Sequence, residues 1–357
     1  MTYSMAFETA SKVWRERIDR NPEYTIIRND RVVRTSYSDS YVLQSDYEAI
    51  LRLKRDLLRR YSGSPLEEAL PGMVEETPEG DCYCITSRER ISVPDEDADA
   101  VLHELVRDFT LIFGIGKRKD RELRERGYST IRDLRQHRRF GPDARRCLEI
   151  LEAGDPCQIQ GLVSRWHSRS HPLSMLTAAL YGREQFLFLD LETLGIYQRP
   201  IILIGIAGVE GDSLVIRQYL LRSVEEELPA LLAALRHMGQ EKVFVTYNGR
   251  TFDIPYLRER YTYYGEHARL EHPHFDMLHP ARRQWRDRFP DCRLTTLEKE
   301  LFGVVREHDV PGALVPEFYE TFLTTGNPGP LVPVVMHNRQ DLISLARLFC
   351  LFREGGP

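Results

Sequence analysis

The 357-residue sequence predicts an α/β fold, in which a mixed sheet flanked by helices follows a mostly helical region. Two observations predict this fold. Strand and helix signals alternate from about residue 184 to 353, and three apolar strand segments precede the first helix there. Residues from about 100 to 182 carry mainly helical patterns. We therefore expect an N-terminal region of unknown role (1–95), a helical region (96–183) and a C-terminal α/β domain (184–353).

Apolar runs and turn signals predict the elements of each region in order. In the N-terminal region we expect a basic helix at 47–61, a small hairpin at 81–93 and a linker or helix start at 94–99. In the C-terminal domain we expect strands at 186–190, 201–207, 214–220 and 242–247, a turn at 208–212, and helices at 223–238, 252–264 and 331–352. Three consecutive strands, a helix and a further strand is the order of a ribonuclease-H-like sheet.

Composition limits the class of protein. Hydrophobic residues make up 42% of the chain and charged residues 29%, which indicates a soluble protein with a sizeable core. The formal charge of −5 excludes a uniformly basic nucleic-acid binder. The six cysteines form no CxxC pair, and neither a signal peptide nor a long apolar run is visible. We expect a cytoplasmic protein with reduced thiols and no membrane association.

Asp190 and Glu192 form an acidic pair at the end of the apolar segment 186–189. Residues i and i+2 of a strand point to the same face, so both carboxylates lie side by side. Like charges this close repel each other unless a cation lies between them. Carboxylate oxygens without soft ligands suit Mg²⁺ or Mn²⁺.

Three further residues complete the pattern. Asp253 follows a strand, and taken alone it is more typical of a helix N-cap. His337 and Asp341 share one face of a predicted helix, where an ordinary surface pair is the simpler interpretation of that segment alone. Together with Asp190 and Glu192, however, they describe a two-metal site that cleaves phosphodiester bonds. His337 would take the proton from the attacking water.

The segments around these residues resemble a known superfamily. Three segments resemble the three motifs of the DnaQ-like DEDD exonucleases, and they are residues 186–195 (FLFLDLETLG), 246–260 (TYNGRTFDIPYLRER) and 337–341. Three further segments resemble the YprB-like ribonuclease-H-fold exonucleases within that superfamily, and they are residues 276–285, 292–301 and 306–311. The resemblance covers residues from about 184 to 353. The resemblance implies 3′-to-5′ exonuclease activity with two Mg²⁺ or Mn²⁺ ions. It also implies a role in DNA repair beside a helicase partner. The implied metal ligands are Asp190, Glu192, Asp253 and Asp341, and the implied general base is His337.

Some roles stay open at the level of sequence. Three residues separate His337 from Asp341, which is the spacing of the tyrosine-bearing branch, so Glu192 is an alternative group for orienting the water. Asp276 is either a supporting acid of the site or a cap for the following helix. The arginines at 250, 282 and 283 either bind phosphate or are simply solvated.

Residues 114–127 resemble a helix–hairpin–helix element. Gly114, Gly116, Leu123 and Gly127 fit its pattern, whereas Asp120 stands where a small residue is usual. A glycine turn at a helix N-terminus exposes N–H groups that can bind a phosphate. Between residues 117 and 146 there are 12 lysines and arginines against five acids. The predicted nucleic-acid contacts are Gly114, Gly116, Lys117, Arg118, Lys119 and Asn248.

These patterns predict a metal-dependent 3′-to-5′ exonuclease whose favoured substrate is DNA, as single strands or 3′ ends. Two alternatives remain at this level. One is an RNA-processing exonuclease, since no motif reads the 2′-hydroxyl. The other is a nucleic-acid-binding module that has lost turnover, although its acid set is complete.

Overall fold

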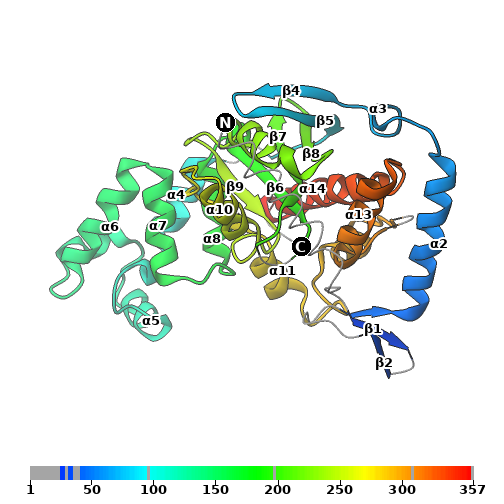
Figure 1. The fold of residues 1–357 in the computed structure, drawn as a ribbon. Coiled ribbons are helices and arrows are strands. Elements are labelled where there is room, and N and C mark those ends of the chain that lie inside the picture. The colour runs from blue at the N-terminus through cyan, green and yellow to red at the C-terminus, as the bar shows by residue number, and fades with distance from the viewer. Residues whose placement is uncertain are drawn as a thin grey trace.

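A seven-stranded mixed sheet forms the centre of the structure, with strand order β10-β9-β6-β7-β8-β5-β4 (Figure 1). The computed structural model describes residues 25–28, 31–34, 41–94, 97–195, 198–306 and 309–354, with side chains from Tyr47 onward. The predicted absence of a signal peptide concerns residues outside this range. No helix within the described ranges is long and apolar enough to cross a membrane.

The middle of the sheet is an antiparallel meander of β6 (Phe186–Thr193), β7 (Ile201–Glu210) and β8 (Ser213–Leu220). After α9 (Glu227–Leu235), β9 (Val243–Thr246) returns to pair in parallel with β6, and β10 (His274–Asp276) pairs in parallel with β9. This order confirms the predicted ribonuclease-H-like α/β fold. The turn after β7 is shorter than predicted, because Val209 is buried and the ladder with β8 continues through residue 210.

Two strands from the N-terminal part of the chain extend this sheet. β5 (Gly80–Arg90) pairs antiparallel with β8, with Tyr83 opposite Leu220, and β4 (Met73–Thr77) pairs with β5. The sequence had placed these residues in a region of their own, but the structure adds them to the C-terminal domain. The reason is burial, because residues 82–85 lie in the core of the sheet.

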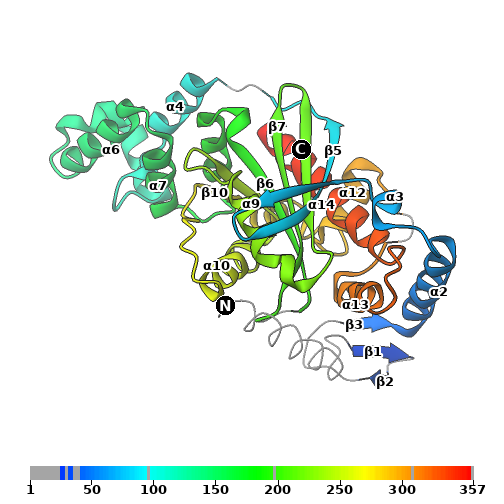
Figure 2. The same ribbon diagram turned by 45° about the horizontal axis from the view of Figure 1, so that its top comes forward.

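Helix α2 (Gln44–Arg60) also packs against the C-terminal domain (Figure 2). Leu53 and Leu57 contact the core of the sheet, and Lys54 forms an ion pair with Glu317 of α13 (Val315–Thr325). α2 corresponds to the helix predicted at 47–61. It therefore serves as an outer layer of the C-terminal domain.

Each face of the sheet has its own core. On one face Leu187, Leu189 and Leu191 pack with α9, α10 (Asp253–Tyr263) and α13. On the other face Phe186 and Phe188 pack with α11 (Leu278–Trp285), α12 (Leu294–Phe302) and α14 (Leu331–Arg353). Because successive side chains of β6 point to opposite faces, this alternation determines which helices each side chain packs against.

The helical region forms a separate lobe beside the sheet (Figure 1). Its helices are α4 (Ala98–Arg107), α5 (Lys117–Glu125), α6 (Gly141–Ala153), α7 (Pro156–Trp166) and α8 (Pro172–Leu176). They enclose a third core that includes Leu105, Phe109 and Val163. Asp97 caps α4 by accepting hydrogen bonds from the N–H groups of Asp99 and Ala100. The segment predicted at 94–99 as a linker or helix start therefore ends in the first turn of a helix. Residues 95–96 of that segment lie outside the described residues.

The remaining elements are short. They are β1 (Thr25–Arg28), β2 (Arg31–Arg34), β3 (Tyr41–Leu43), α3 (Leu66–Ala69) and the 3₁₀ turns Phe109–Leu111, Ile131–Gln136, Thr177–Leu180, Arg183–Gln185, Val224–Glu226 and Gly312–Leu314. The first three strands form a small sheet of order β2-β1-β3.

Candidate active site

Strand β6 presents Asp190 and Glu192 to the face of the sheet that α14 covers. Leu189 and Leu191 point into the opposite core, so the intervening acids follow Phe186 and Phe188 on the α14 side. Glu192 is buried and Asp190 is half-buried. The pair predicted from the spacing therefore lies under a helix that brings its own polar residues.

Helix α14 supplies His337 and Asp341 to these acids. His337 Nε2 lies 3.3 Å from Asp341 Oδ2 and 4.0 Å from Glu192 Oε1. The two residues share a helix face, as their spacing predicts, and this face points to the site rather than to solvent.

Asn338 also belongs to the site, and sequence reasoning missed it. Its side chain is fully buried, and its Nδ2 donates to Asp190 Oδ2 at 2.8 Å and to the Asp190 carbonyl at 3.1 Å. Its Oδ1 accepts from Gln218 Nε2 at 2.9 Å. Asn338 thus fixes the Asp190 carboxylate, and its only sequence signal is a polar residue on an otherwise apolar helix face.

Gly205 on β7 makes room for this asparagine. A Cβ at Gly205 would lie 2.2 Å from Asn338 Oδ1, and the amide cannot withdraw without losing its hydrogen bonds.

We expect Gly205→Ala to lower the free energy of unfolding by about 1–3 kcal/mol and to reduce any cleavage rate, because it displaces Asn338 from Asp190. Thermal melts and turnover assays measure both effects. Gly208→Ala on the same strand is the matched control, since a Cβ there meets nothing within 4 Å. Equal behaviour of the two variants would contradict this role.

Asp253 reaches the same place from α10. β9 pairs with β6 only as far as Phe188, and beyond that point Asp253 Oδ1 accepts the N–H of Leu191 at 3.1 Å. Asp253 is the first residue of α10 rather than its N-cap, which is Phe252. Its carboxylate therefore faces the sheet beside the β6 acids.

The crowded carboxylates have strongly perturbed pKa values. Burial, followed by the charges of Asp341, Glu192 and Asp253, holds the pKa of Asp190 well above its usual range. Burial also raises the pKa values of Glu192 and Asp253 to about 7 each. Such a site carries more negative charge than its surroundings offset.

Two cations of the chain offset part of this charge. Burial favours a raised pKa for Asp341, but the hydrogen bond from His337 and the Arg306 guanidinium lower it overall. Arg306 is itself held by Glu298 of α12, and Asp309 Oδ1 lies 2.6 Å from His337 Nδ1. Asp309 thereby orients the imidazole so that Nε2 faces the acids.

The donor chemistry of the site fits a divalent cation. Four carboxylates with hard oxygen donors converge at the end of β6, and their mutual repulsion is what a cation would relieve. Within the described part of the chain, no three His, Cys, Asp or Glu side chains are already arranged around a single ion position. Arg306 forms an ion pair with Asp341, so one of the four carboxylates already has a positively charged partner.

Comparison with known proteins agrees with this fold. Residues 187–352 match the family model described as the RNase_H superfamily. This domain is ribonuclease-H-like. It is also similar to the uncharacterized protein YprB of Bacillus subtilis (strain 168), at 33% identity over 199 residues, or 54% of this chain and 47% of the relative. The chain thus spans about half the length of that relative. The match supports a ribonuclease-H-like fold for the domain that carries the four acids.

Asp276 of the ribonuclease-H-like domain supports the site from outside. Its carboxylate accepts the N–H groups of Asn248 at 2.8 Å, Arg250 at 3.1 Å and Leu278 at 3.2 Å. It thereby orders the loop before Asp253 and caps the start of α11, so both sequence interpretations hold in part. Asn248 is exposed in that loop with φ of 67°, where a nucleic acid could reach it.

The predicted contacts near residue 114 lie in the helical lobe and not at the acids. Gly114 has a φ of 79°, which favours glycine, and Gly116 is the N-cap of α5. Arg118 and Lys119 each pair with Glu122 at 2.9 Å. Asp120 pairs with Arg124 one turn along α5, and Arg124 donates to the carbonyl oxygen of Arg107 at the end of α4. Nucleic-acid binding by these residues stays a prediction.

Proposed function

We propose that the protein is a divalent-metal-dependent 3′-to-5′ exonuclease with DNA as its favoured substrate. The observation that carries this proposal is the convergence of Asp190, Glu192, Asp253 and Asp341 from β6, α10 and α14. In a ribonuclease-H-like domain, four such acids match the ligand set implied by the DEDD motifs. The proposal also covers the role of His337 as general base.

Each side chain of the site would have a distinct role in cleavage. Asp190, Glu192, Asp253 and Asp341 would hold two Mg²⁺ or Mn²⁺ ions, which when bound stabilise charge on the attacking and leaving oxygens. His337 would accept the water proton at Nε2, the nitrogen that faces Glu192 and Asp341. The hydrogen bonds that the His337 imidazole makes to Asp309 and Asp341 raise the pKa of His337 despite its burial, which favours the protonated imidazole. Cations that neutralise the nearby acids would lower this pKa and leave Nε2 free to accept a proton.

An end-labelled substrate panel tests the proposal. Single-stranded DNA, duplex DNA and RNA, each labelled at the 5′ or the 3′ end, are incubated with Mn²⁺ or Mg²⁺ and wild-type protein, Asp190→Ala or Asp341→Ala. We expect the 3′ label to be released first as mononucleotide while the 5′ label shortens gradually. Both variants and EDTA should stop the reaction.

Other outcomes select other functions. Wild-type degradation equal to that of both variants would refute the nuclease assignment, because cleavage would then come from a contaminant. Internal cuts would contradict exonuclease action. Faster removal from RNA would favour the RNA-processing alternative, and metal-independent binding without cleavage would favour a non-catalytic binding module.

A further inference from the structure

An exposed aromatic pair stands on the surface of the helical lobe. Phe113 is 66% exposed and Trp166 is 38% exposed, and their ring centroids are 5.5 Å apart. The neighbouring Ile112 and Ile115 are buried in the core of the lobe. Exposed aromatic rings of this size are typical of surfaces that bind a partner.

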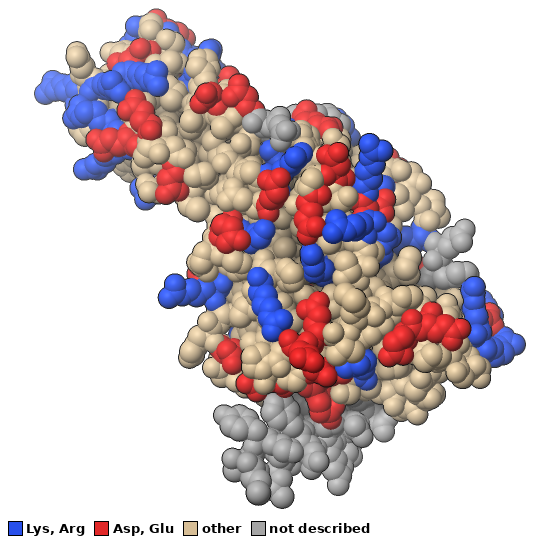
Figure 3. All heavy atoms as spheres, turned by 90° about the horizontal axis from the view of Figure 1, so that it is seen from above, with Lys and Arg blue, Asp and Glu red and all other residues tan. Residues whose placement is uncertain are grey.

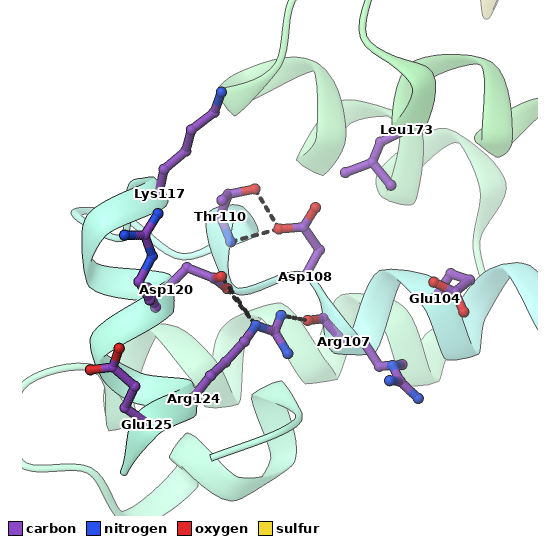
Figure 4. Close-up of a pocket in the computed structure, with 10 residues that line it drawn as sticks. Glu104, Arg107, Asp108, Thr110, Lys117, Asp120, Arg124, Glu125 and Leu173 are labelled. Carbon is purple, nitrogen blue, oxygen red and sulfur yellow. Dashed lines mark hydrogen bonds and ion pairs between the residues drawn. The ribbon is translucent and has the colours of Figure 1, made fainter. Parts of the chain in front are cut away.

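Hydrogen bonds hold the two rings on ordered backbone. The Thr110 hydroxyl lies 3.0 Å from Nε2 of His167, the residue after Trp166. Asp108 in turn accepts the Thr110 N–H at 2.8 Å (Figure 4). The chain segments that carry Phe113 and Trp166 are thus tied together, so a flat partner could stack there with little ordering cost.

Cationic groups flank this aromatic pair. Arg139 Nη2 lies 3.8 Å from the position that a Cβ on Gly114 would take, directly after Phe113. A cavity of about 630 Å³ between α4, α5 and α8 is lined by four basic residues, Arg107, Lys117, Arg121 and Arg124, and by four acidic ones, Glu104, Asp108, Asp120 and Glu125 (Figure 4). Lysine and arginine side chains gather at the outer end of the lobe, and acidic side chains lie among them (Figure 3). Aromatic rings beside cations are the combination that binds single-stranded nucleic acid.

We propose that Phe113 and Trp166 stack on the bases of an unpaired nucleic-acid strand, while Arg139 binds its phosphates. This inference rests on the proposed nuclease function and names the form of its substrate. A duplex keeps its bases stacked on each other, so the pair favours single strands over duplex.

Binding assays test the stacking directly. Fluorescence anisotropy of labelled oligothymidylate and of a labelled duplex is measured in EDTA in the full-length Asp190→Ala background, which removes turnover. Adding Phe113→Ala and Trp166→Ala should weaken single-strand binding by about tenfold or more and change duplex binding by less than about twofold. Phe113→Tyr with Trp166→Phe should keep near-full affinity. Tyr263→Ala, at another exposed aromatic residue, is the matched control.

Each outcome decides the inference. Loss of single-strand affinity with an unchanged melting temperature supports it, as does its restoration by the conservative variants. Unchanged affinity, or equal weakening of single strand and duplex, overturns the stacking site and leaves the nuclease assignment intact. If the Asp190→Ala protein bound no nucleic acid and the wild type cleaved none, the proposed function would fail together with this inference.

Discussion

Replacing Asp253 with asparagine is expected to abolish cleavage and at the same time to stabilise the metal-free protein above neutral pH. The loss of activity should be about 10²–10³-fold or more, because the variant removes one of four carboxylates placed to bind the metal ions. Asparagine can still accept the Leu191 N–H, so the fold around the site should survive. Turnover of a 3′-labelled strand with Mn²⁺ measures the loss.

The gain in stability follows from the sign of the pKa shift. Burial raises the pKa of Asp253 in the folded state to about 7, whereas an unfolded aspartate titrates near 3.8. The wild type therefore loses stability as the pH rises through about 7, while the asparagine variant does not. In EDTA at about pH 8 the variant should be more stable by on the order of 2 kcal/mol, and below about pH 4 the difference should vanish. Added Mn²⁺ should raise the melting temperature of the wild type more than that of the variant.

A matched control separates these effects from general changes in α10. Glu259 lies exposed on the same helix, and Glu259→Gln should leave both turnover and the pH profile of stability unchanged. Undiminished cleavage by Asp253→Asn would remove this residue from the metal ligands. Equal melting temperatures in EDTA at pH 8 would show that burial does not raise the pKa of Asp253 in the folded protein.

The parts of the site that the sequence predicts are those governed by local periodicity. Side chains of a strand repeat every two residues, which placed Asp190 and Glu192 together. Side chains of a helix repeat every three or four, which placed His337 with Asp341. The apolar runs around them also predicted which segments form β6, β7, β8 and α14.

The rest depends on contacts between distant segments. No local pattern shows that Tyr83 pairs with Leu220, because the buried part of β5 is only four residues long. Asn338 reads as one polar residue in a helix until Gly205 and Asp190 are seen beside it. Arg306 lies in a segment that the family resemblance singles out, but its ion pairs with Asp341 and Glu298 appear only in three dimensions.

The second large effect concerns the ion pair that seats α10 on the sheet. Arg260 and Glu227 are 2% and 0% exposed, and two hydrogen bonds of 2.7 and 2.6 Å join them. Glu227 also accepts the N–H of Ile201 at the start of β7, at 2.9 Å. The pair therefore ties α9, α10 and β7 together, and it holds the helix whose first residue is Asp253.

Glu227→Gln is expected to lower the free energy of unfolding by about 3–5 kcal/mol, because it leaves the Arg260 charge buried without a partner. Urea denaturation measures the loss. Adding Arg260→Met should recover much of it, since the buried charge is then gone and glutamine can still accept the Ile201 N–H.

An exposed ion pair between α10 and the segment after it provides the comparison. Arg258 and Glu271 are 3.5 Å apart and largely exposed, so Glu271→Gln should change the free energy of unfolding by less than about 1 kcal/mol. If Glu227→Gln matched Glu271→Gln, the buried pair would not be what fixes α10. Asp253 would then owe its position to the Leu191 N–H and the Asp276-bound loop alone.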